Sequence, residues 1–249
     1  MRLRAFIFFI FAGLILGPTG PTLAAPPARA AKTPTPSPTA QSPVPLDYEF
    51  ESLKKEAVAG DAEAQFVISQ QLMVWNLETV KDPAKKKENF LEALQWLRRS
   101  ADQEYPRAMT ALGEIYEYGS KKYSTVFGIS DKGVNIPRDK AEARRWYQKA
   151  ADLKELEAMI KLATFCATGV AGPKDPVAAQ KLIQMARDKA VSQNNKDILP
   201  SLAEIYEKGH IVPKDLAMAI KLYDQAAKLG SFEAKAKYDE MRAKGQPRP

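Results

Sequence analysis

The feature that most constrains this chain is an internal repeat. A nine-residue segment that begins at Ala111 reads ALGEIYEYG, and a closely similar segment that begins at Ser201 reads SLAEIYEKG. Weaker copies lie at 161–169 and 237–245, and a degenerate copy lies at 67–75. Repetition of this kind indicates stacked copies of one structural unit, because a single unit cannot bury its own apolar face.

A second motif follows the middle copies and completes the unit. The sequences PRD at 137–139, PKD at 173–175 and PKD at 213–215 occupy equivalent places. Proline cannot continue the preceding helix, and aspartate is a strong N-cap for the next one. Glycine ends each first segment except the degenerate one, where Trp75 stands, and glycine suits a left-handed helix C-cap. Apolar spacings of three and four between these signals predict a pair of helices in each unit.

One apolar position anchors the first helix of every unit, at Ile68, Leu112, Leu162, Leu202 and Tyr238. The last two positions are 36 residues apart, whereas Leu112 and Leu162 are 50 apart, so the second unit carries 14 additional residues between Gly119 and Asp139. The next residue is small in four copies, which predicts close helix approach there: Ser69, Gly113, Ala163 and Ala203.

These motifs resemble the Sel-one-like repeat family, a relative of the tetratricopeptide repeats. In the second unit the matching residues are Ala108, Leu112, Gly113, Tyr116, Gly119, Asp139, Trp146, Tyr147, Lys149, Ala150 and Ala151. In the fourth unit they are Leu202, Tyr206, Gly209, Asp215, Tyr223, Ala226 and Ala227. The first unit departs most from the pattern, since Trp75 replaces the expected glycine.

The resemblance implies an all-α fold, a right-handed α/α superhelical solenoid of antiparallel helix pairs. We expect the solenoid to occupy residues 47–249, with four helix-pair repeats followed by a C-terminal capping helix. The expected units are about 61–104, 105–154, 155–196 and 197–230, with the cap at 231–245. Members of the family mostly act as scaffolds or adaptors that bind other proteins, so the resemblance implies a non-catalytic repeat protein without a cofactor.

The N-terminal region has a different composition. Arg2 and Arg4 precede the apolar run 5–16, and a small-residue cleavage pattern ends at Ala24, which together predict a signal peptide over 1–24. Residues 25–46 are rich in Pro, Thr, Ser and Ala and predict a disordered linker. We therefore expect an exported protein, periplasmic or extracellular, in which the signal is either cleaved or retained as an anchor.

Composition excludes several kinds of chemistry. The 249 residues contain one Cys and one His, which rules out a disulfide scaffold and a Cys/His zinc site. Cys166 stands on the packed stripe and is predicted to be a buried thiol, and His210 follows Gly209 in a loop. No catalytic or metal-binding residue is assigned. A hydrolase such as a β-lactamase remains an alternative, although the family branch associated with that activity is rich in Cys pairs.

The first helices also carry a second face, which lies opposite the packed one when residues are placed at 100° intervals. In tetratricopeptide-like superhelices this face lines the concave groove. Its acidic members are Glu63, Glu114, Glu117, Glu157, Asp197, Glu204, Glu207, Glu233 and Glu240, against the cations Arg107, Lys208 and Lys244. The predicted partner-binding groove consists of Glu114, Glu117, Tyr118, Glu157, Asp197, Glu204, Glu207 and Lys208.

The formal charge of the whole chain is +7, and removal of Arg2 and Arg4 with the signal leaves +5. The cations concentrate on the second helices, at Arg98, Arg99, Arg144, Arg145, Lys149, Lys181, Arg187, Lys221 and Lys228. We expect the acidic groove to bind another protein or peptide with a cationic segment, and the basic convex face to meet an anionic envelope surface. A cell-wall-associated regulator that binds envelope components is the alternative. Nucleic acid is not an expected partner, and the oligomeric state is open.

Overall fold

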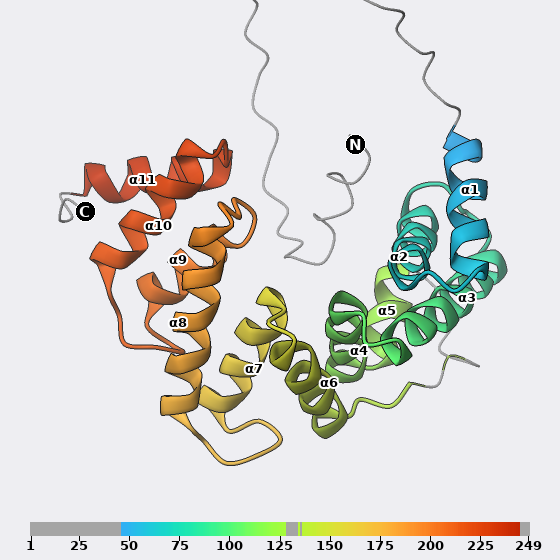
Figure 1. The fold of residues 1–249 in the computed structure, drawn as a ribbon, viewed down its shortest axis with the longest axis horizontal. Helices are drawn as coiled ribbons and strands as arrows, with labels where there is room; N and C mark the ends of the chain where they lie inside the picture. Colours follow the sequence, from blue (N-terminus) through green and yellow to red (C-terminus); the bar gives the residue numbers. More distant parts are fainter. Residues whose placement is uncertain (1–45, 128–133, 135, 245–249) are drawn as a thin grey trace, which may run out of the picture.

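The computed structural model describes residues 46–127, 134 and 136–244, and these residues form helices without a β-strand. The sequence analysis predicted an all-α fold, and the structure confirms it (Figure 1). The helices are α1 (Leu46–Val58), α2 (Ala62–Glu78), α3 (Pro83–Asp102), α4 (Pro106–Tyr118), α5 (Ser120–Phe127), α6 (Lys140–Asp152), α7 (Leu156–Thr168), α8 (Pro176–Ser192), α9 (Leu199–Lys208), α10 (Leu216–Lys228) and α11 (Phe232–Ala243).

The helices pack chiefly as sequence neighbours. The closest packing joins α2 with α3, α4 with α6, α7 with α8, and α9 with α10, and we call these pairs the first to fourth units. Helix α1 packs on α2, and α11 packs on α10. The units follow an arc that has α1 at one end and α11 at the other (Figure 1). This arrangement is a solenoid, because each unit contacts mainly the unit before it and the unit after it.

The predicted signal peptide (1–24) and almost all of the predicted linker (25–46) lie outside the described residues. The exception is Leu46, which begins α1. Helix α1 is an element to which the sequence analysis assigned no role. Its residues Phe50, Leu53 and Ala57 are spaced three and four apart and pack against the core. None of the described helices has the length and the apolar character needed to cross a membrane.

The repeated aspartates cap the second helices as predicted. Asp139 accepts hydrogen bonds from the N–H groups of Ala141 and Glu142, each at 2.9 Å. Asp175 and Asp215 each accept one from the N–H three residues ahead. The backbone N–H of each aspartate donates to a carbonyl on the first helix of the same unit, and the three accepting residues are Tyr116, Cys166 and Tyr206. These residues hold equivalent positions in the repeat, so the loop of each unit is fixed at both of its ends.

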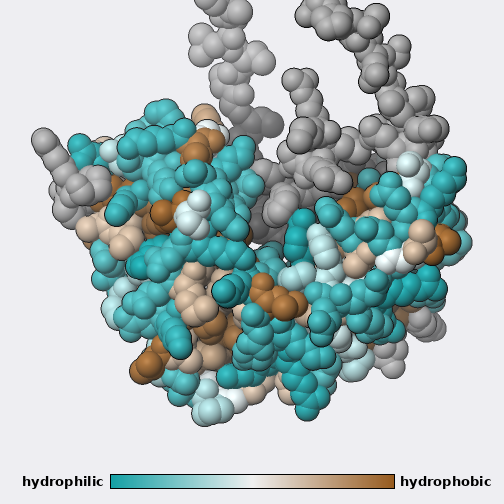
Figure 2. Space-filling model, viewed as in Figure 1, coloured by the Kyte–Doolittle hydropathy of each residue, from teal (hydrophilic) through white to brown (hydrophobic). Residues whose placement is uncertain are grey.

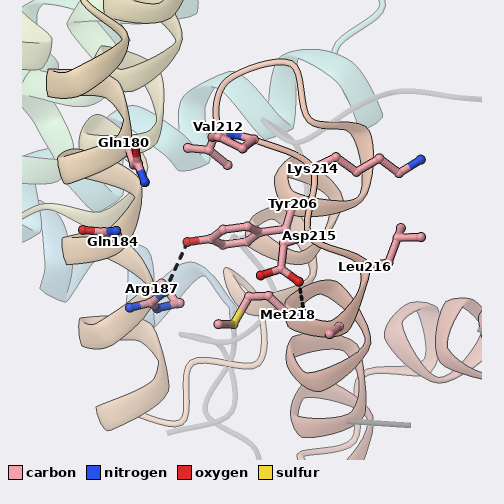
Figure 3. A pocket seen from close by; sticks show the side chains of 11 residues that line it. Gln180, Gln184, Arg187, Tyr206, Val212, Lys214, Asp215, Leu216 and Met218 are labelled. Carbon is pink, nitrogen blue, oxygen red and sulfur yellow. Dashed lines mark hydrogen bonds between the residues drawn. The ribbon is translucent and has the colours of Figure 1, made fainter. Parts of the chain in front are cut away.

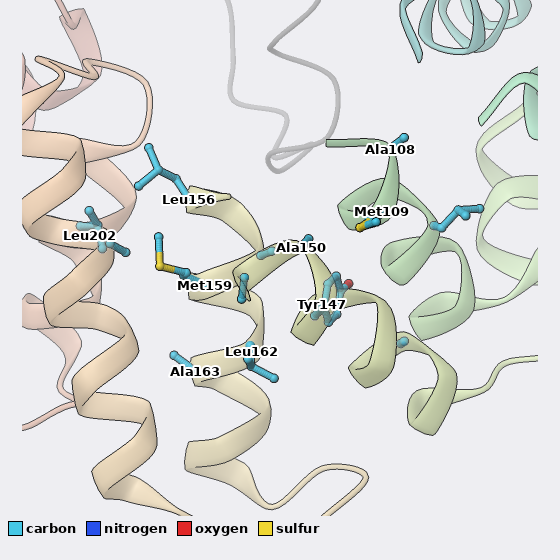
Figure 4. Close-up of a cluster of buried hydrophobic side chains, with 14 of the residues drawn as sticks. Ala108, Met109, Tyr147, Ala150, Leu156, Met159, Leu162, Ala163 and Leu202 are labelled. Carbon is cyan, nitrogen blue, oxygen red and sulfur yellow. The ribbon is translucent and has the colours of Figure 1, made fainter. Parts of the chain in front are cut away.

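The core is built from small residues that bring the helices close together. Ile68, Leu112, Leu162 and Leu202 are all buried at the fixed position. Gly113 shows why the next residue is small, since a Cβ added there would lie 2.5 Å from the ring of Tyr147. Tyr147 is itself fully buried (Figure 4). Its ring packs edge-on against that of Phe165 of the third unit, with ring centroids 5.5 Å apart.

The insert of the second unit contains one further helix, α5. The N–H of Ser120 at its start donates to the carbonyl of Ile136 at 2.9 Å, which closes the insert back onto its own beginning. Val134 and Ile136 are buried, and α5 contacts both α2 and α4. The insert therefore packs against two units, and it lies next to the predicted groove residues at the end of α4.

Candidate protein-binding surface

The predicted groove residues of the second unit gather around a buried ion pair. Glu114 of α4 is only 3% exposed, and its Oε1 atom lies 2.5 Å from Nζ of Lys161 on α7. Burial alone would lower the pKa of Lys161, but Glu114 outweighs it and raises that pKa above the ordinary value. The pair joins two neighbouring units, and Glu114 acts from beneath the surface rather than at it.

Tyr118 and α5 cover this ion pair. Lys122 Nζ lies 3.8 Å from the ring centroid of Tyr118, and Lys161 Nζ lies 5.9 Å from the same centroid on the α7 side. Burial lowers the pKa of Lys122 and raises that of Tyr118. The two lysines hold the ring by cation–π contact, beside the buried pair of Lys161 and Glu114.

Glu157 adds a second acidic group to the same cluster. It is partly buried on the first turn of α7. Burial, together with the nearby charge of Glu114, raises its pKa to about 7, although Lys161 acts in the opposite direction. Glu157 therefore changes its charge near neutral pH, unlike an ordinary surface glutamate.

Two further groove residues are held by tyrosines of the second helices. Glu117 accepts a hydrogen bond of 2.7 Å from the hydroxyl of Tyr147, and Glu207 accepts one of 2.9 Å from the hydroxyl of Tyr223. The pKa values of both tyrosines are raised, first by burial and then by the neighbouring glutamates, so both hydroxyls keep their protons. A carboxylate has about four acceptor positions, and one hydrogen bond leaves the rest for a partner.

The fourth unit presents its groove residues more openly. Glu204 forms an ion pair with Lys208 one turn ahead on α9, and their side chains are 52% and 55% exposed. Asp197 is exposed, but it lies in the turn before α9, which begins at Leu199 and not at 197 as the unit boundary suggested. Pro200 at the second helical position fits the later start, since proline is favoured in a first turn.

The cations of the second helices are placed less uniformly than expected. Arg144 is partly buried and turns toward the third unit, where Nη1 donates to the carbonyl of Val170 at 3.1 Å. Arg187 donates to Asp188 and to the hydroxyl of Tyr206. Exposed cations include Arg98, Arg145, Lys181 and Lys221. Hydrophilic residues dominate the face shown in Figure 2, and its apolar residues form small separate groups.

The remaining candidates have structural roles. Cys166 is a buried free thiol, and His210 is exposed, as predicted for both. Trp96 is buried, and its indole N–H donates to Glu92 at 3.2 Å. Across the described part of the chain, no group of three or more His, Cys, Asp and Glu side chains is arranged to hold a metal ion.

The sequence analysis did not assign Lys161, Tyr147 or Tyr223 to this surface. Tyr147 and Tyr223 stand at the tyrosine position of the family's second-helix motif, so their shared place in the repeat was the available signal. Lys161 lies one residue before the fixed Leu162, outside the face chosen at 100° intervals. Its long side chain nevertheless reaches Glu114 across the junction.

The capped helix pairs and their close stacking through small residues define this molecule as an α-helical repeat protein. The chain belongs to the Sel1 repeat family, whose model matches more than half of it, at residues 83–105, 106–125, 129–155, 156–190 and 201–231. The second and third matches meet inside the insert of the second unit, with only residues 126–128 between them. Sel1 repeat proteins generally mediate protein–protein interactions and typically serve as non-catalytic scaffolds.

The solved structures that resemble the chain include two repeat proteins. One is c5321 of uropathogenic Escherichia coli, described as a protective antigen with an SLR fold. It is 27% identical to this chain, with a TM-score of 0.51, and the match covers 80% of this chain and 37% of the antigen's chain. The other is a Sel1 repeat protein from Oxalobacter formigenes, 23% identical over 81% of this chain and 74% of its own, also with a TM-score of 0.51. The match thus spans well under half of the Escherichia coli antigen. No curated protein matches the sequence.

Proposed function

We propose that this protein is an exported scaffold or adaptor that binds a cationic segment of another protein through the acidic face of its first helices. Family membership supports the general role of protein binding. The charge preference and the export are inferences from the chain itself.

One observation supports the charge preference: two units each contain a glutamate whose carboxylate accepts a hydrogen bond from a tyrosine of the paired helix. Glu117 and Glu207 occupy equivalent positions, and a tyrosine hydroxyl from the paired helix fixes each of them. A carboxylate that is already fixed loses little conformational entropy when a lysine or arginine of a partner binds it. Glu204 adds an exposed negative charge one helical turn from Glu207. The acids therefore favour capture and orientation of a positively charged segment.

A binding assay with a cationic peptide tests this proposal. Fluorescence anisotropy of a labelled peptide with alternating Lys and Ala would compare the wild-type chain with the double variant Glu204→Gln/Glu207→Gln. We expect the double variant to bind about tenfold more weakly, because it loses two favourable charges at one site. Binding to the wild-type chain should also weaken as salt is raised from 50 to ~300 mM.

The matched control is Glu142→Gln/Asp224→Asn. It changes the net charge by the same amount, but on second helices, where Glu142 and Asp224 pair with Arg145 and Lys228 of their own helices. This control should bind the peptide like the wild type. An equal loss of affinity in both double variants would show that only net charge matters and would overturn the proposed surface.

Export is tested separately, since nothing in the folded region depends on it. We expect fractionation of native cells to place the protein outside the inner membrane. N-terminal sequencing of the mature chain should begin at Ala25 if the signal is cleaved where the sequence predicts. Recovery in the cytoplasm with Met1 intact would contradict the proposed export and leave the binding surface to be judged by the peptide assay.

A further inference from the structure

A hollow of about 680 Å³ lies between the third and fourth units, and none of the predicted groove residues lines it. Its walls come from α8 on one side and from the segment joining α9 to α10 on the other (Figure 3). The residues that matter most are Gln180, Gln184, Arg187, Tyr206, Val212 and Met218.

The junction between the second and third units is filled at the equivalent position, so the hollow is not a necessary consequence of the repeat. Arg144 stands five residues after Asp139, and Gln180 stands five residues after Asp175, so the two are equivalent. Arg144 fills its junction, with Nη1 bonded to the carbonyl of Val170 and Nη2 lying 3.5 Å from the sulfur of Cys166. Gln180 is shorter and uncharged, and it leaves the corresponding space open.

Two side-chain amides border the hollow without a side-chain hydrogen bond to any other described residue. Gln180 and Gln184 are both exposed and lie one turn apart on α8. Four residues of a helix advance by about 6 Å. Every second residue of an extended peptide recurs at about 6.6 Å, so two amides at this spacing match the backbone of alternate residues.

The charged groups around the hollow are already compensated within the chain. The Nε and Nη2 atoms of Arg187 donate to Asp188 at 2.9 and 2.7 Å. The carboxylate of Asp215 accepts the N–H of Met218 at the start of α10, where the helix dipole favours negative charge. Lys214 extends away from α8 (Figure 3). The surface offered to a ligand is thus close to neutral, with an apolar contribution from the partly buried Met218, whereas Val212 is only 4% exposed.

We propose that this hollow binds an extended, uncharged peptide segment of a partner protein. The amides of Gln180 and Gln184 hydrogen-bond to the peptide backbone, and an apolar side chain of the peptide packs on Met218. Nη1 of Arg187 is 3.4 Å from the hydroxyl of Tyr206, longer than an ordinary hydrogen bond, so it can turn to a peptide carbonyl. This site goes beyond the acidic surface and selects a different ligand.

The test uses the full ¹⁵N-labelled chain and a panel of acetylated, amidated hexapeptides. The uncharged peptides carry Leu, Val or Met among Ser and Thr residues, and matched peptides carry one Lys or one Glu in place of the apolar residue. We expect the side-chain amide signals of Gln180 and Gln184 to shift with uncharged apolar peptides. The dissociation constant should change less than about twofold between 50 and 300 mM salt, unlike binding driven by charge.

The decisive variant is Gln180→Arg, which copies Arg144. It should fill the hollow and weaken peptide binding by at least tenfold. The double variant Gln180→Ala/Gln184→Ala leaves the hollow open and should weaken peptide binding by about three- to tenfold. It replaces Gln180→Arg as the test if the arginine variant fails to fold. The acidic-surface variant Glu204→Gln/Glu207→Gln should bind these peptides like the wild type, which separates this site from the proposed function.

Three results would overturn the proposal. One is the absence of shifts at Gln180 and Gln184 with every uncharged peptide. A second is that the Gln180→Arg variant binds the Glu-containing peptides more strongly than the wild type binds the uncharged peptides. That result would indicate simple charge attraction. A third is exclusive binding of a peptide with the sequence of residues 33–45, which would make the chain's own N-terminal segment the occupant.

Discussion

The second and fourth units carry nearly the same sequence on their first helices, yet the same glutamate has opposite surroundings in the two units. Glu114 is 3% exposed and pairs across a junction with Lys161. Its counterpart Glu204 is 52% exposed in its side chain and pairs with Lys208 of the same helix. One motif thus builds an internal junction in one place and an open surface in another.

The residues that come after each glutamate also differ. Tyr118 and helix α5 come after Glu114, and the Tyr118 ring lies between Lys122 of α5 and Lys161, the partner of Glu114. The equivalent of Tyr118 is Lys208, which is exposed and leads into a short loop. The acidic character of the repeat therefore does not by itself make a binding surface, because a neighbouring unit can bury and pair the acid, as Lys161 does for Glu114. Four predictions test this contrast, in order of expected effect.

The largest effect is expected from Lys161→Met, because it leaves the carboxylate of Glu114 buried without its partner. The free energy of unfolding, measured with urea, should fall by roughly 3 kcal/mol. Lys208→Met in the fourth unit should cost less than about 0.5 kcal/mol, since exposed pairs contribute little. The double variant Glu114→Gln/Lys161→Met should regain part of the loss. Equal effects of the two lysine variants would erase the contrast between the units.

Gly113→Ala should destabilise the second unit by about 2 kcal/mol, since the added Cβ would meet the Tyr147 ring at 2.5 Å. Helix propensity alone predicts the opposite, a gain of about 1 kcal/mol. The fourth unit already has alanine at this position, Ala203, and accommodates it in the core. A Gly113→Ala protein that melts at or above the wild-type temperature would show that Tyr147 can move aside.

Glu157→Gln should change the pH dependence of stability. The pKa of Glu157 is about 7 in the folded chain, against 4.5 as its ordinary value, so folding favours the protonated form. The stability it contributes is full below pH ~4.5 and is lost as the pH rises through 7. The variant should therefore match the wild type at pH 4 and exceed it by on the order of 2 kcal/mol at pH 8. A wild-type excess at pH 8 would contradict this sign.

The smallest effects are expected from the tyrosines that hold Glu117 and Glu207. Tyr147→Phe should lower the free energy of unfolding by about 1.5 kcal/mol and Tyr223→Phe by about 1 kcal/mol, since each removes a hydrogen bond to a carboxylate. Tyr147 lies at the more enclosed junction, next to buried Glu114. Chemical denaturation of both variants measures the difference, and a larger loss at Tyr223 would reverse the ranking.

Much of the fold could be predicted from the sequence, because its signals are local. The aspartates at 139, 175 and 215 cap helices through contacts with residues two or three positions ahead. The buried positions recur with the period of the repeat. Helix α1 went unassigned because it lies outside the repeat, although Phe50, Leu53 and Ala57 have helical spacing. The handedness of the solenoid and the export of the chain stay predictions.

The candidate surface could be predicted only in part. Helical geometry placed Glu117, Glu204 and Glu207 on a common face, but that geometry treats each helix as isolated. Whether a side chain on that face is reached by Lys161 from the next unit, or covered by Tyr118, depends on contacts between units. Asp197 was misplaced for a local reason, since the turn before α9 delays the helix to Leu199.

Membership of the Sel1 repeat family can be read from the sequence, because caps, small residues and apolar spacings act within one unit and recur along the chain. The packing of the units sets which glutamates are accessible and leaves an open hollow between the third and fourth units. Exposure and cavity volume depend on the side chains of neighbouring units, which local sequence patterns do not specify. Arg144 fills one junction, and Gln180 leaves the next one open.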